Sequence, residues 1–149
     1  MTSRTPSVWL FQANPLRTIE AYTQAHFRLE FADTTIQTWG CRQHWRDVKE
    51  GDIAIVFFTG RDRGGGIFGV GEVVKEPDGP GDDVLFALFP RTTRYLIASH
   101  LTYEDLAGVN LPNLRMRKQT VYRILPEQWD TICGLIISRR PALSDELIL

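Results

Sequence analysis

The chain has 149 residues, of which 43% are hydrophobic and 23% charged, and its formal net charge at pH 7 is −1. These values are ordinary for one globular domain with a core of its own, and they exclude a global positive field that would draw the chain onto nucleic acid or a membrane. The apolar runs have the length of strands, which excludes a membrane span, and the polar start of the chain predicts no secretion signal.

The first segment of the chain predicts a strand followed by a helix. Val8–Ala13 is a short apolar run that we assign to an interior strand, and Asn14 with the proline after it ends that strand. Thr18 is a suitable N-cap for a helix that carries His26 on its apolar side.

A strand pair follows in the middle of the chain. Ile53–Phe58 and Ile67–Val74 should form a hairpin across the basic, glycine-rich turn Arg61–Gly66. The string Gly64–Gly69 also satisfies G-x-G-x-x-G, the fingerprint of a dinucleotide site. That fingerprint must open a helix, whereas the residues that follow here favour a strand, so we reject the dinucleotide interpretation.

The second half predicts a loop, a long strand, a short helix, another strand and a last helix. Glu76–Asp83 is a surface loop, and Val84–Ala98 should form one strand that bends at its proline. Thr102–Asp105 has the pattern of a capping box that opens a short helix. Thr120–Leu125 is a strand, and Pro126 suits the first position of the last helix. Four residues share the apolar face of that helix: Trp129, Ile132, Cys133 and Ile136.

This order of elements indicates a single domain over residues 1–149 of mixed α/β class, with loose termini at residues 1–7 and 139–149. A mixed sheet that curls into a barrel, with helices at its flanks, accommodates these elements.

Trp39 is the tryptophan that core packing explains least. The residues from Gln37 to Gln43 around it are otherwise polar or small, which predicts a loop. A tryptophan in such a loop is either a lid on the core or a flat platform on which a ligand stacks, and the sequence favours neither. Trp9 and Trp129, in contrast, sit in apolar patterns and should be core residues.

Cys41 and His44 raise two alternatives, a thiol nucleophile or a pair of metal ligands. Two ligands do not make a metal site, and nothing signals the orienting group and oxyanion hole that a Cys–His dyad requires. Cys41 and Cys133 are also too few for a disulfide framework. We therefore expect no metal, no cofactor and no catalytic residue, and we expect reduced thiols and a cytoplasmic location.

Positive charge gathers in loops. The basic clusters are Arg61 with Arg63, Arg91 with Arg94, and Arg115, Arg117 and Lys118. Such clusters are commonly solvated faces, but the combination of basic loops with Trp39 favours a nucleic-acid surface.

Three stretches resemble the EVE domain family of the PUA-like superfamily, whose relatives include YTH domains. Trp9–Pro15 is similar to the opening strand of the family, although it lacks the usual Lys-Ser-Glu before the proline. Trp39-Gly40 is similar to the tryptophan loop of the family, and Gly51-Asp52 to its Gly-Asp turn. Ile53–Thr59 and Gly66–Val74 resemble the central hairpin, which ends in Gly-x-Gly-Glu-Val-Val.

The resemblance implies a PUA-like pseudobarrel with a pocket for a flipped-out base, which in this superfamily is often methylated or otherwise modified. Trp39 would then stack on the base, Phe58 and Thr59 would line the opposite wall, and Gln12 and Asn14 would read the polar edge. The residues implied for the pocket are Gln12, Asn14, Trp39, Cys41, Phe58 and Thr59, and those implied for the phosphates are Arg115, Arg117 and Lys118.

The leading hypothesis is therefore a non-catalytic module that binds a modified base in DNA or RNA. The alternative is a small-molecule sensor that binds a free nucleobase or nucleoside in the same pocket, which the near-neutral charge favours. A third reading is a hydrolase that uses Cys41 or His44. The lack of a convincing carboxylate or metal cluster counts against that reading.

Overall fold

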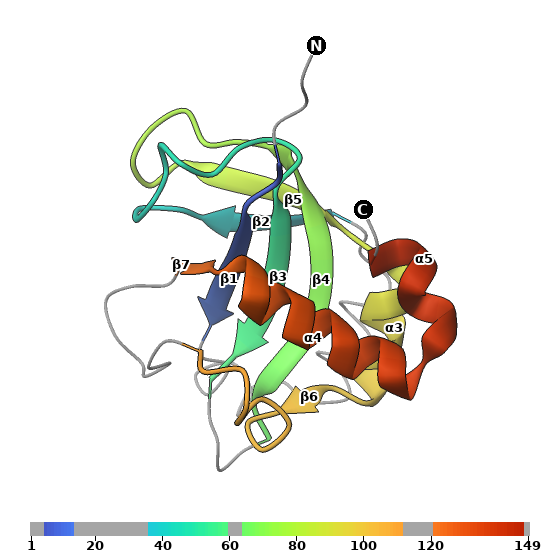
Figure 1. The fold of residues 1–149 in the computed structure, drawn as a ribbon. Coiled ribbons are helices and arrows are strands. Elements are labelled where there is room, and N and C mark those ends of the chain that lie inside the picture. The colour runs from blue at the N-terminus through green and yellow to red at the C-terminus, as the bar shows by residue number, and fades with distance from the viewer. Residues whose placement is uncertain (1–4, 14–35, 60–63, 112–120, 148–149) are drawn as a thin grey trace, which may run out of the picture.

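The computed structural model of the chain describes residues 5–13, 36–59, 64–111 and 121–147, and its centre is a mixed seven-stranded sheet (Figure 1). The strands are β1 (Val8–Ala13), β2 (Ile36–Gly40), β3 (Ile53–Phe58), β4 (Gly66–Lys75), β5 (Asp83–Leu88), β6 (Leu101–Thr102) and β7 (Val121–Ile124). Six of them lie in the order β2-β5-β4-β3-β1-β7, and β6 pairs with β4 beside this row. β1 runs parallel to β3, and the other pairings among the described strands are antiparallel.

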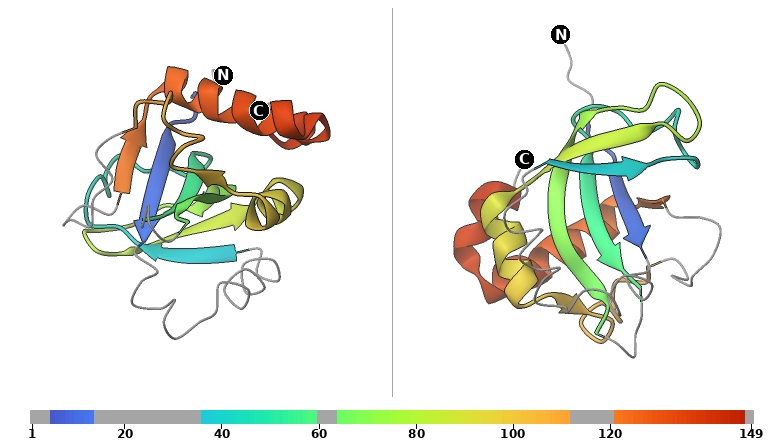
Figure 2. Two further views of the ribbon diagram at one scale, coloured as in Figure 1. Left: turned by 90° about the horizontal axis from the view of Figure 1, so that it is seen from below. Right: turned by 180° about the vertical axis from the view of Figure 1, so that it is seen from behind.

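The sheet curls until its edge strand β2 meets β1, which lies four places away in the row. In a flat sheet this separation would be about 19 Å, because neighbouring strands lie about 4.8 Å apart. The ring centroids of Trp39 on β2 and Phe11 on β1 are instead only 6.1 Å apart. The sheet is therefore a partly closed barrel, and its curvature is visible in both views of Figure 2.

Strand alternation divides the core between the two faces of this sheet. On β3, Ile55 and Phe57 point to one face, Val56 and Phe58 point to the other, and every residue of the strand is buried. We call the buried residues on the face of Ile55 and Phe57 the outer cluster, and those on the face of Val56 and Phe58 the inner cluster. The inner cluster comprises Trp9, Phe11, Cys41, Val48, Ala54, Val56, Phe58, Phe68, Val73, Val84, Phe86, Leu88, Ile97 and Val121, with Trp39 and Trp45 packed against it.

The helices cover the outer face of the sheet. They are α3 (Pro90–Ala98), α4 (Pro126–Arg139) and α5 (Ser144–Leu147), with a 3₁₀ turn η2 (Pro141–Leu143) before α5. In Figure 1, α4 lies across β1, β3 and β4. Its buried residues Ile132 and Ile136 join the outer cluster together with Leu96 of α3. No helix within the described ranges combines the length and the apolar character that crossing a membrane requires.

One expected strand proved to be a helix. We predicted that Val84–Ala98 would continue as a bent strand, but β5 ends at Leu88 and Pro90 begins α3. Proline suits the first helical position, because its ring fixes φ and that position needs no N–H donor. The buried residues of α3 follow a helical spacing and not an alternating one: Thr92, Thr93, Leu96 and Ile97.

The expected loose tail over residues 139–149 is also folded in its described part. η2 and α5 place Leu143 and Leu147 in the outer cluster. From α5, the carboxylate of Glu146 accepts the backbone N–H groups of Arg91 (3.1 Å) and Thr92 (2.7 Å) at the start of α3. Because Phe89, the N-cap residue of α3, forms no side-chain cap, this segment completes a helix far away in the sequence.

Several other sequence predictions are confirmed. β3 and β4 form the expected hairpin, and Gly66 begins a strand instead of a nucleotide-binding helix. Pro126 opens α4 as expected. Thr102 and Asp105 exchange the two hydrogen bonds of a capping box, although they open a turn and not a helix. The predicted helix after Thr18 lies outside the described residues.

Candidate functional site

Trp39 stands at the edge of the inner face of the sheet. We predicted a loop here, but Trp39 belongs to β2 and pairs in register with Val84 of β5. Its indole is partly exposed, and its centroid lies 6.1 Å from that of Phe11 and 6.0 Å from that of Phe86. Two buried aromatic rings thus support an indole that still reaches solvent, so the structure gives Trp39 both a packed side and an accessible part.

Cys41 and Phe58, which we also predicted for the site, belong to the inner cluster and are more deeply buried than Trp39. Cys41 is 0% exposed and Phe58 is 4% exposed, and both pack in the inner cluster with Trp39 at its rim. Phe58 lies 5.1 Å from Phe68 between ring centroids. Thr59, which follows β3 directly, is 3% exposed. Cys41 and Phe58 therefore share the inner cluster with the rings that support Trp39, while the ring contacts of Trp39 itself are to Phe11 and Phe86.

Gln12 occupies a different position. It is 5% exposed and lies one residue beyond Phe11 on β1, so strand alternation directs its side chain to the outer face. In the parallel register it stands opposite Phe57, which belongs to the outer cluster. The structure therefore brings Trp39, Cys41 and Phe58 together and sets Gln12 on the other side of the sheet. The remaining predicted site residues lie outside the described ranges: Asn14, Arg115, Arg117 and Lys118.

The Cys41 thiol has the properties of a packing residue. Burial raises its pKa to about 11, and its Sγ lies 3.1 Å from the carbonyl oxygen of Gln43, to which the S–H donates. Burial likewise raises the pKa of Cys133 to about 12, with a further contribution from the nearby charge of Asp130. Both thiols are protonated at neutral pH, and a thiol is a far weaker nucleophile than a thiolate. Within the described ranges, no three His, Cys, Asp or Glu side chains are grouped as metal ligands.

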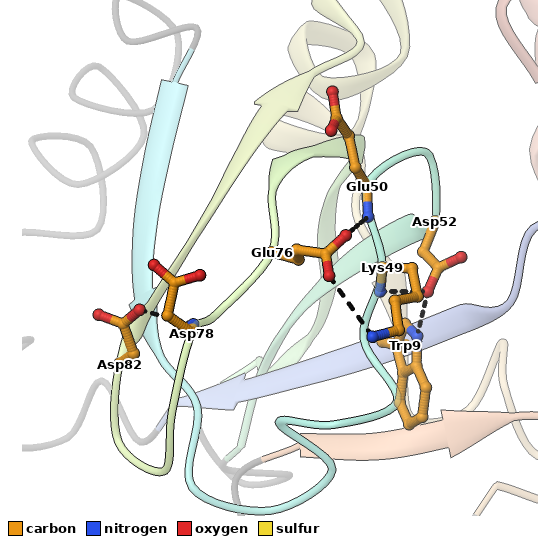
Figure 3. Close-up of polar contacts among 7 residues, drawn as sticks. All are labelled: Trp9, Lys49, Glu50, Asp52, Glu76, Asp78 and Asp82. Carbon is orange, nitrogen blue, oxygen red and sulfur yellow. Dashed lines mark hydrogen bonds and ion pairs between the residues drawn. The ribbon is translucent and has the colours of Figure 1, made fainter.

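A buried carboxylate organises the start of β1. Asp52 is 0% exposed and accepts hydrogen bonds from the backbone N–H groups of Ser7 (3.0 Å) and Lys49 (2.9 Å). It also accepts the indole Nε1–H of Trp9 at 2.9 Å (Figure 3). Three donors therefore satisfy a charge that is out of contact with water, and they join β1 to the loop between β2 and β3.

Trp9 was predicted as a core residue, and it is 1% exposed, but it also supports two surface groups. The His44 ring centroid lies 5.1 Å from that of the indole, and the Arg123 guanidinium carbon lies 5.6 Å from it. Beside them, the guanidinium carbon of Arg46 lies 5.0 Å from the ring centroid of the partly exposed Trp45. Sequence reasoning missed Arg46 and Arg123, because only the register of β7 against β1 places Arg123 opposite Trp9.

An acidic rim lies beside this region. The Lys49 ammonium pairs with Glu76 at 3.4 Å, and the Glu50 N–H donates to the same carboxylate at 3.2 Å (Figure 3). Further along the loop, the Asp78 N–H donates to Asp82 at 2.8 Å, and this bond is the main cause of the lowered pKa of Asp82. Anionic ligands are therefore disfavoured along residues 76–83.

A groove of about 520 Å³ lies on the opposite, outer side of the sheet. Trp129 and Cys133 of α4 line it together with Val8 and Ile53, the first residues of β1 and β3. None of the predicted base-binding residues borders this groove, so it is separate from the Trp39 site.

No protein-family model matches the chain, and no curated protein sequence matches it. Solved structures do. A crystal structure of a Pseudomonas putida protein aligns over 87% of this chain and 99% of its own, at 19% identity and a TM-score of 0.56. An NMR structure of Rpa0253 from Rhodopseudomonas palustris aligns over 87% and 92%, at 14% identity and a TM-score of 0.56. The DUF55 domain of human thymocyte nuclear protein 1 covers 87% and 98%, at 16% identity and a TM-score of 0.48.

At these identities the likeness concerns the fold alone. The mixed sheet with its flanking helices is common to the chain and to the Pseudomonas putida and Rhodopseudomonas palustris structures, which have the EVE-type fold. The chain therefore has the PUA-like fold of EVE-type structures, as its sequence predicted.

Proposed function

We propose that the chain is a non-catalytic module that binds nucleic acid and captures a flipped, modified base against Trp39. The observation that carries this proposal is the position of Trp39 at the rim of the inner cluster, partly exposed and supported by Phe11 and Phe86. An indole held in this way is a rigid face for stacking, because ligand binding need not order it first.

The energetics limit what this platform achieves alone. Extruding a base from a duplex costs a few kcal/mol, and stacking on an aromatic side chain returns about 1–3 kcal/mol. One methyl group in an apolar wall adds discrimination of about 1–3 kcal/mol at most. Single-stranded or already unpaired substrates are therefore preferred. We propose that Cys41, Phe58 and Thr59 form the wall and that Asn14 contributes polar readout at the end of β1. Gln12 is left out of the pocket, because it lies on the outer face of the sheet.

The absence of catalysis is part of the proposal. The raised pKa of the Cys41 thiol, about 11, supports it, because an enzyme of the cysteine type needs a thiolate near neutral pH. We propose that Arg115, Arg117 and Lys118, which precede β7 in the sequence, neutralise phosphates and take no part in chemistry.

The alternative is a sensor for a free nucleobase or nucleoside at the same platform. The formal net charge of −1 favours it, because a neutral small ligand requires no positive field. The two functions differ in salt dependence. Nucleic-acid binding weakens steeply with salt through counterion release, whereas binding of a neutral base does not.

A panel of short single-stranded oligonucleotides that differ in one modified base tests the proposal. Fluorescence anisotropy should show that one modification binds up to about 10- to 200-fold more tightly than its unmodified counterpart. Free nucleosides should compete weakly. Equal affinity for all members of the DNA and RNA panels would overturn base capture, and tight, salt-insensitive binding of a free nucleoside would establish the alternative.

A further inference from the structure

We propose a second contact surface for the nucleic-acid backbone, made of residues other than Arg115, Arg117 and Lys118, and we call it the Trp9 platform. It consists of Trp9, His44, Trp45, Arg46 and Arg123. This inference rests on the proposed function, since it names where the phosphates next to the captured base are held.

The platform has a rigid foundation. The Trp9 indole is fixed by its hydrogen bond to the buried Asp52 carboxylate, which also holds the N–H of Lys49 at the end of the same loop. Within the loop, the N–H groups of Asp47 (2.8 Å) and Val48 (3.0 Å) both donate to the His44 carbonyl oxygen. The loop that carries His44, Trp45 and Arg46 is therefore anchored on both sides, and its cations are presented by a fixed frame.

Its two arginines carry charge that no carboxylate neutralises within the part of the chain that the structure describes. Arg123 is exposed, lies over Trp9, and forms one long hydrogen bond to the Ser7 hydroxyl at 3.4 Å. Arg46 is exposed and lies over Trp45. Two carboxylates lie close to the platform. Asp47 lies 3.7 Å from His44 Nδ1, and the buried Asp52 accepts N–H groups of Trp9, Ser7 and Lys49. Elsewhere, Arg91 and Arg139 do have carboxylate partners, so unpaired arginines are not the rule here.

The combination of guanidinium groups on aromatic rings fits a phosphodiester backbone. Arginine offers a planar fork of donors to phosphate oxygens, and the exposed edges of Trp45 and His44 suit sugars and bases. The position also fits the proposed base site, because β2 runs from Trp39 straight into this loop. Trp39 and Trp45 pack against the same inner cluster. Glu76, at the start of the acidic rim, pairs with Lys49 at the end of the same loop, so the rim should repel a nucleic-acid strand there.

The test compares the salt dependence of binding in two double variants. In Arg46→Gln/Arg123→Gln both charges are removed, and in Arg46→Lys/Arg123→Lys both are kept. We compare the slope of log K against log salt for an unmodified single-stranded oligonucleotide. Each phosphate contact contributes about 0.7 to this slope, so the loss of two contacts in the Gln pair should make it shallower by about 1.4. It should be nearly unchanged in the Lys pair. Modified and unmodified oligonucleotides should lose affinity by the same factor. Arg140→Gln is the matched control and should leave the slope unchanged, because Arg140 is also an exposed arginine over an aromatic ring, that of Tyr95 at 5.1 Å.

A second measurement does not depend on how the variants fold. An oligonucleotide with neutral methylphosphonate linkages should bind the wild-type protein with a slope near zero. This slope should be shallower than that of the native oligonucleotide on the Gln pair, which keeps the phosphate contacts proposed for Arg115, Arg117 and Lys118. An unchanged slope in a folded Gln pair, or a native slope with the neutral backbone, overturns the inference. Binding of polyglutamate with the same slope would also overturn it, because the surface would then be a general anion site.

The failure of this inference and that of the proposed function are distinguishable. If the Gln pair loses slope while Trp39→Ala leaves the preference for a modified base intact, the backbone surface is real and base capture at Trp39 is wrong. If Trp39→Ala abolishes that preference and the Gln pair keeps its slope, the opposite holds. If the wild-type protein binds no oligonucleotide, both are wrong.

Discussion

The indole Nε1–H of Trp9 donates to the carboxylate of Asp52 at 2.9 Å, in a position where both residues are almost completely buried. This bond connects β1 to the turn before β3, the strand with which β1 pairs in parallel. Because parallel strands have no short turn to set their register, a side-chain bond of this kind helps to specify it.

We expect Asp52→Asn to lower the free energy of unfolding by about 3 kcal/mol. The substitution replaces one carboxylate oxygen with an NH2 group, which would then face an N–H donor instead of accepting from it. Hydrogen bonds to a charged group contribute about 1.5–3 kcal/mol each. Urea unfolding measures the change, and Asp78→Asn in the exposed loop is the control, with an expected effect within about 0.5 kcal/mol. A loss below about 1 kcal/mol for Asp52→Asn would show that the bond to Trp9 does not hold β1.

Two glycine substitutions should have opposite signs. A Cβ on Gly71 would collide with the carbonyl oxygen of Ala87 and lie 2.9 Å from the Leu88 Cα, so Gly71→Ala must push β5 away from β4. Gly134 lies in α4 with no heavy atom within 4 Å of its would-be Cβ. Gly134→Ala should therefore stabilise the fold by about 0.5–1 kcal/mol, and Gly71→Ala should cost more than about 2 kcal/mol. Thermal unfolding of both variants checks this, and equal shifts would contradict the close packing of β4 and β5.

Glu146 should make stability depend on acid pH. Burial alone would raise the pKa of this carboxyl, but hydrogen bonds from Thr92 and Arg91 outweigh burial and lower it. Because the folded pKa is depressed, the stabilisation is complete above the ordinary glutamate pKa of about 4.3 and is lost as pH falls through the folded value. Glu146→Gln should cost about 1 kcal/mol near neutral pH, as for the loss of a helix cap. The difference from wild type should shrink below about pH 4.3. A difference that is constant down to acid pH would rule out a role for the charge.

Trp39→Ala separates the two roles that the sequence left open. As a stacking platform, Trp39 should contribute about 1–3 kcal/mol to binding of the preferred oligonucleotide. The cost in stability should stay below the roughly 3–5 kcal/mol that deletion of a buried tryptophan causes. Anisotropy and urea unfolding on the same preparation measure both quantities, with Trp129→Ala on α4 as a control that should spare binding. An unfolded Trp39→Ala protein would show that the indole is a core lid.

The two thiols should be unreactive in the native state. With the pKa of Cys41 at about 11, roughly one thiol in ten thousand is ionised at neutral pH. Disulfide reagents should therefore modify the native protein far more slowly than the urea-unfolded protein, in which both cysteines have ordinary pKa values. Rapid labelling of native Cys41 would contradict its assignment as a packing residue.

The sequence predicted those parts of the fold whose signals are local. The hairpin of β3 and β4 and the start of α4 at Pro126 rest on turn and cap residues that act within a few positions. It failed at α3, because the β-branched and aromatic residues Thr92, Thr93, Tyr95 and Ile97 favour a strand. The cap that stabilises the helix comes from Glu146 in a distant segment. The sequence also suggested a loop at Trp39. β2 is a short edge strand that pairs with β5 and is partly exposed along its length, so its residues show too little apolar alternation to predict a strand.

The site shows the same division. Trp39 was recognisable because a tryptophan among polar neighbours is unusual in a core. Arg123 was not, because its role depends on the antiparallel register of β7 against β1, which places it opposite Trp9. Long-range register is set by the whole core and not by neighbouring residues, so no local pattern in the sequence reports it.

The position of β1 in the sheet bears on how the chain folds. β1 is the first strand in sequence, yet its partners β3 and β7 both come later, with Val8 opposite Ile53 on one side and Ile124 on the other. No hairpin can therefore nucleate at β1, while β3, β4 and β5 pair successively as antiparallel neighbours. The β3–β5 meander is the segment able to form early, and insertion of β1 closes the longest loops last. Such non-local closure slows folding toward roughly the millisecond-to-second range. Until β1 is in place, the edge of β3 that it covers has unpaired N–H and C=O groups. A partly folded chain could pair with another copy of itself at this edge.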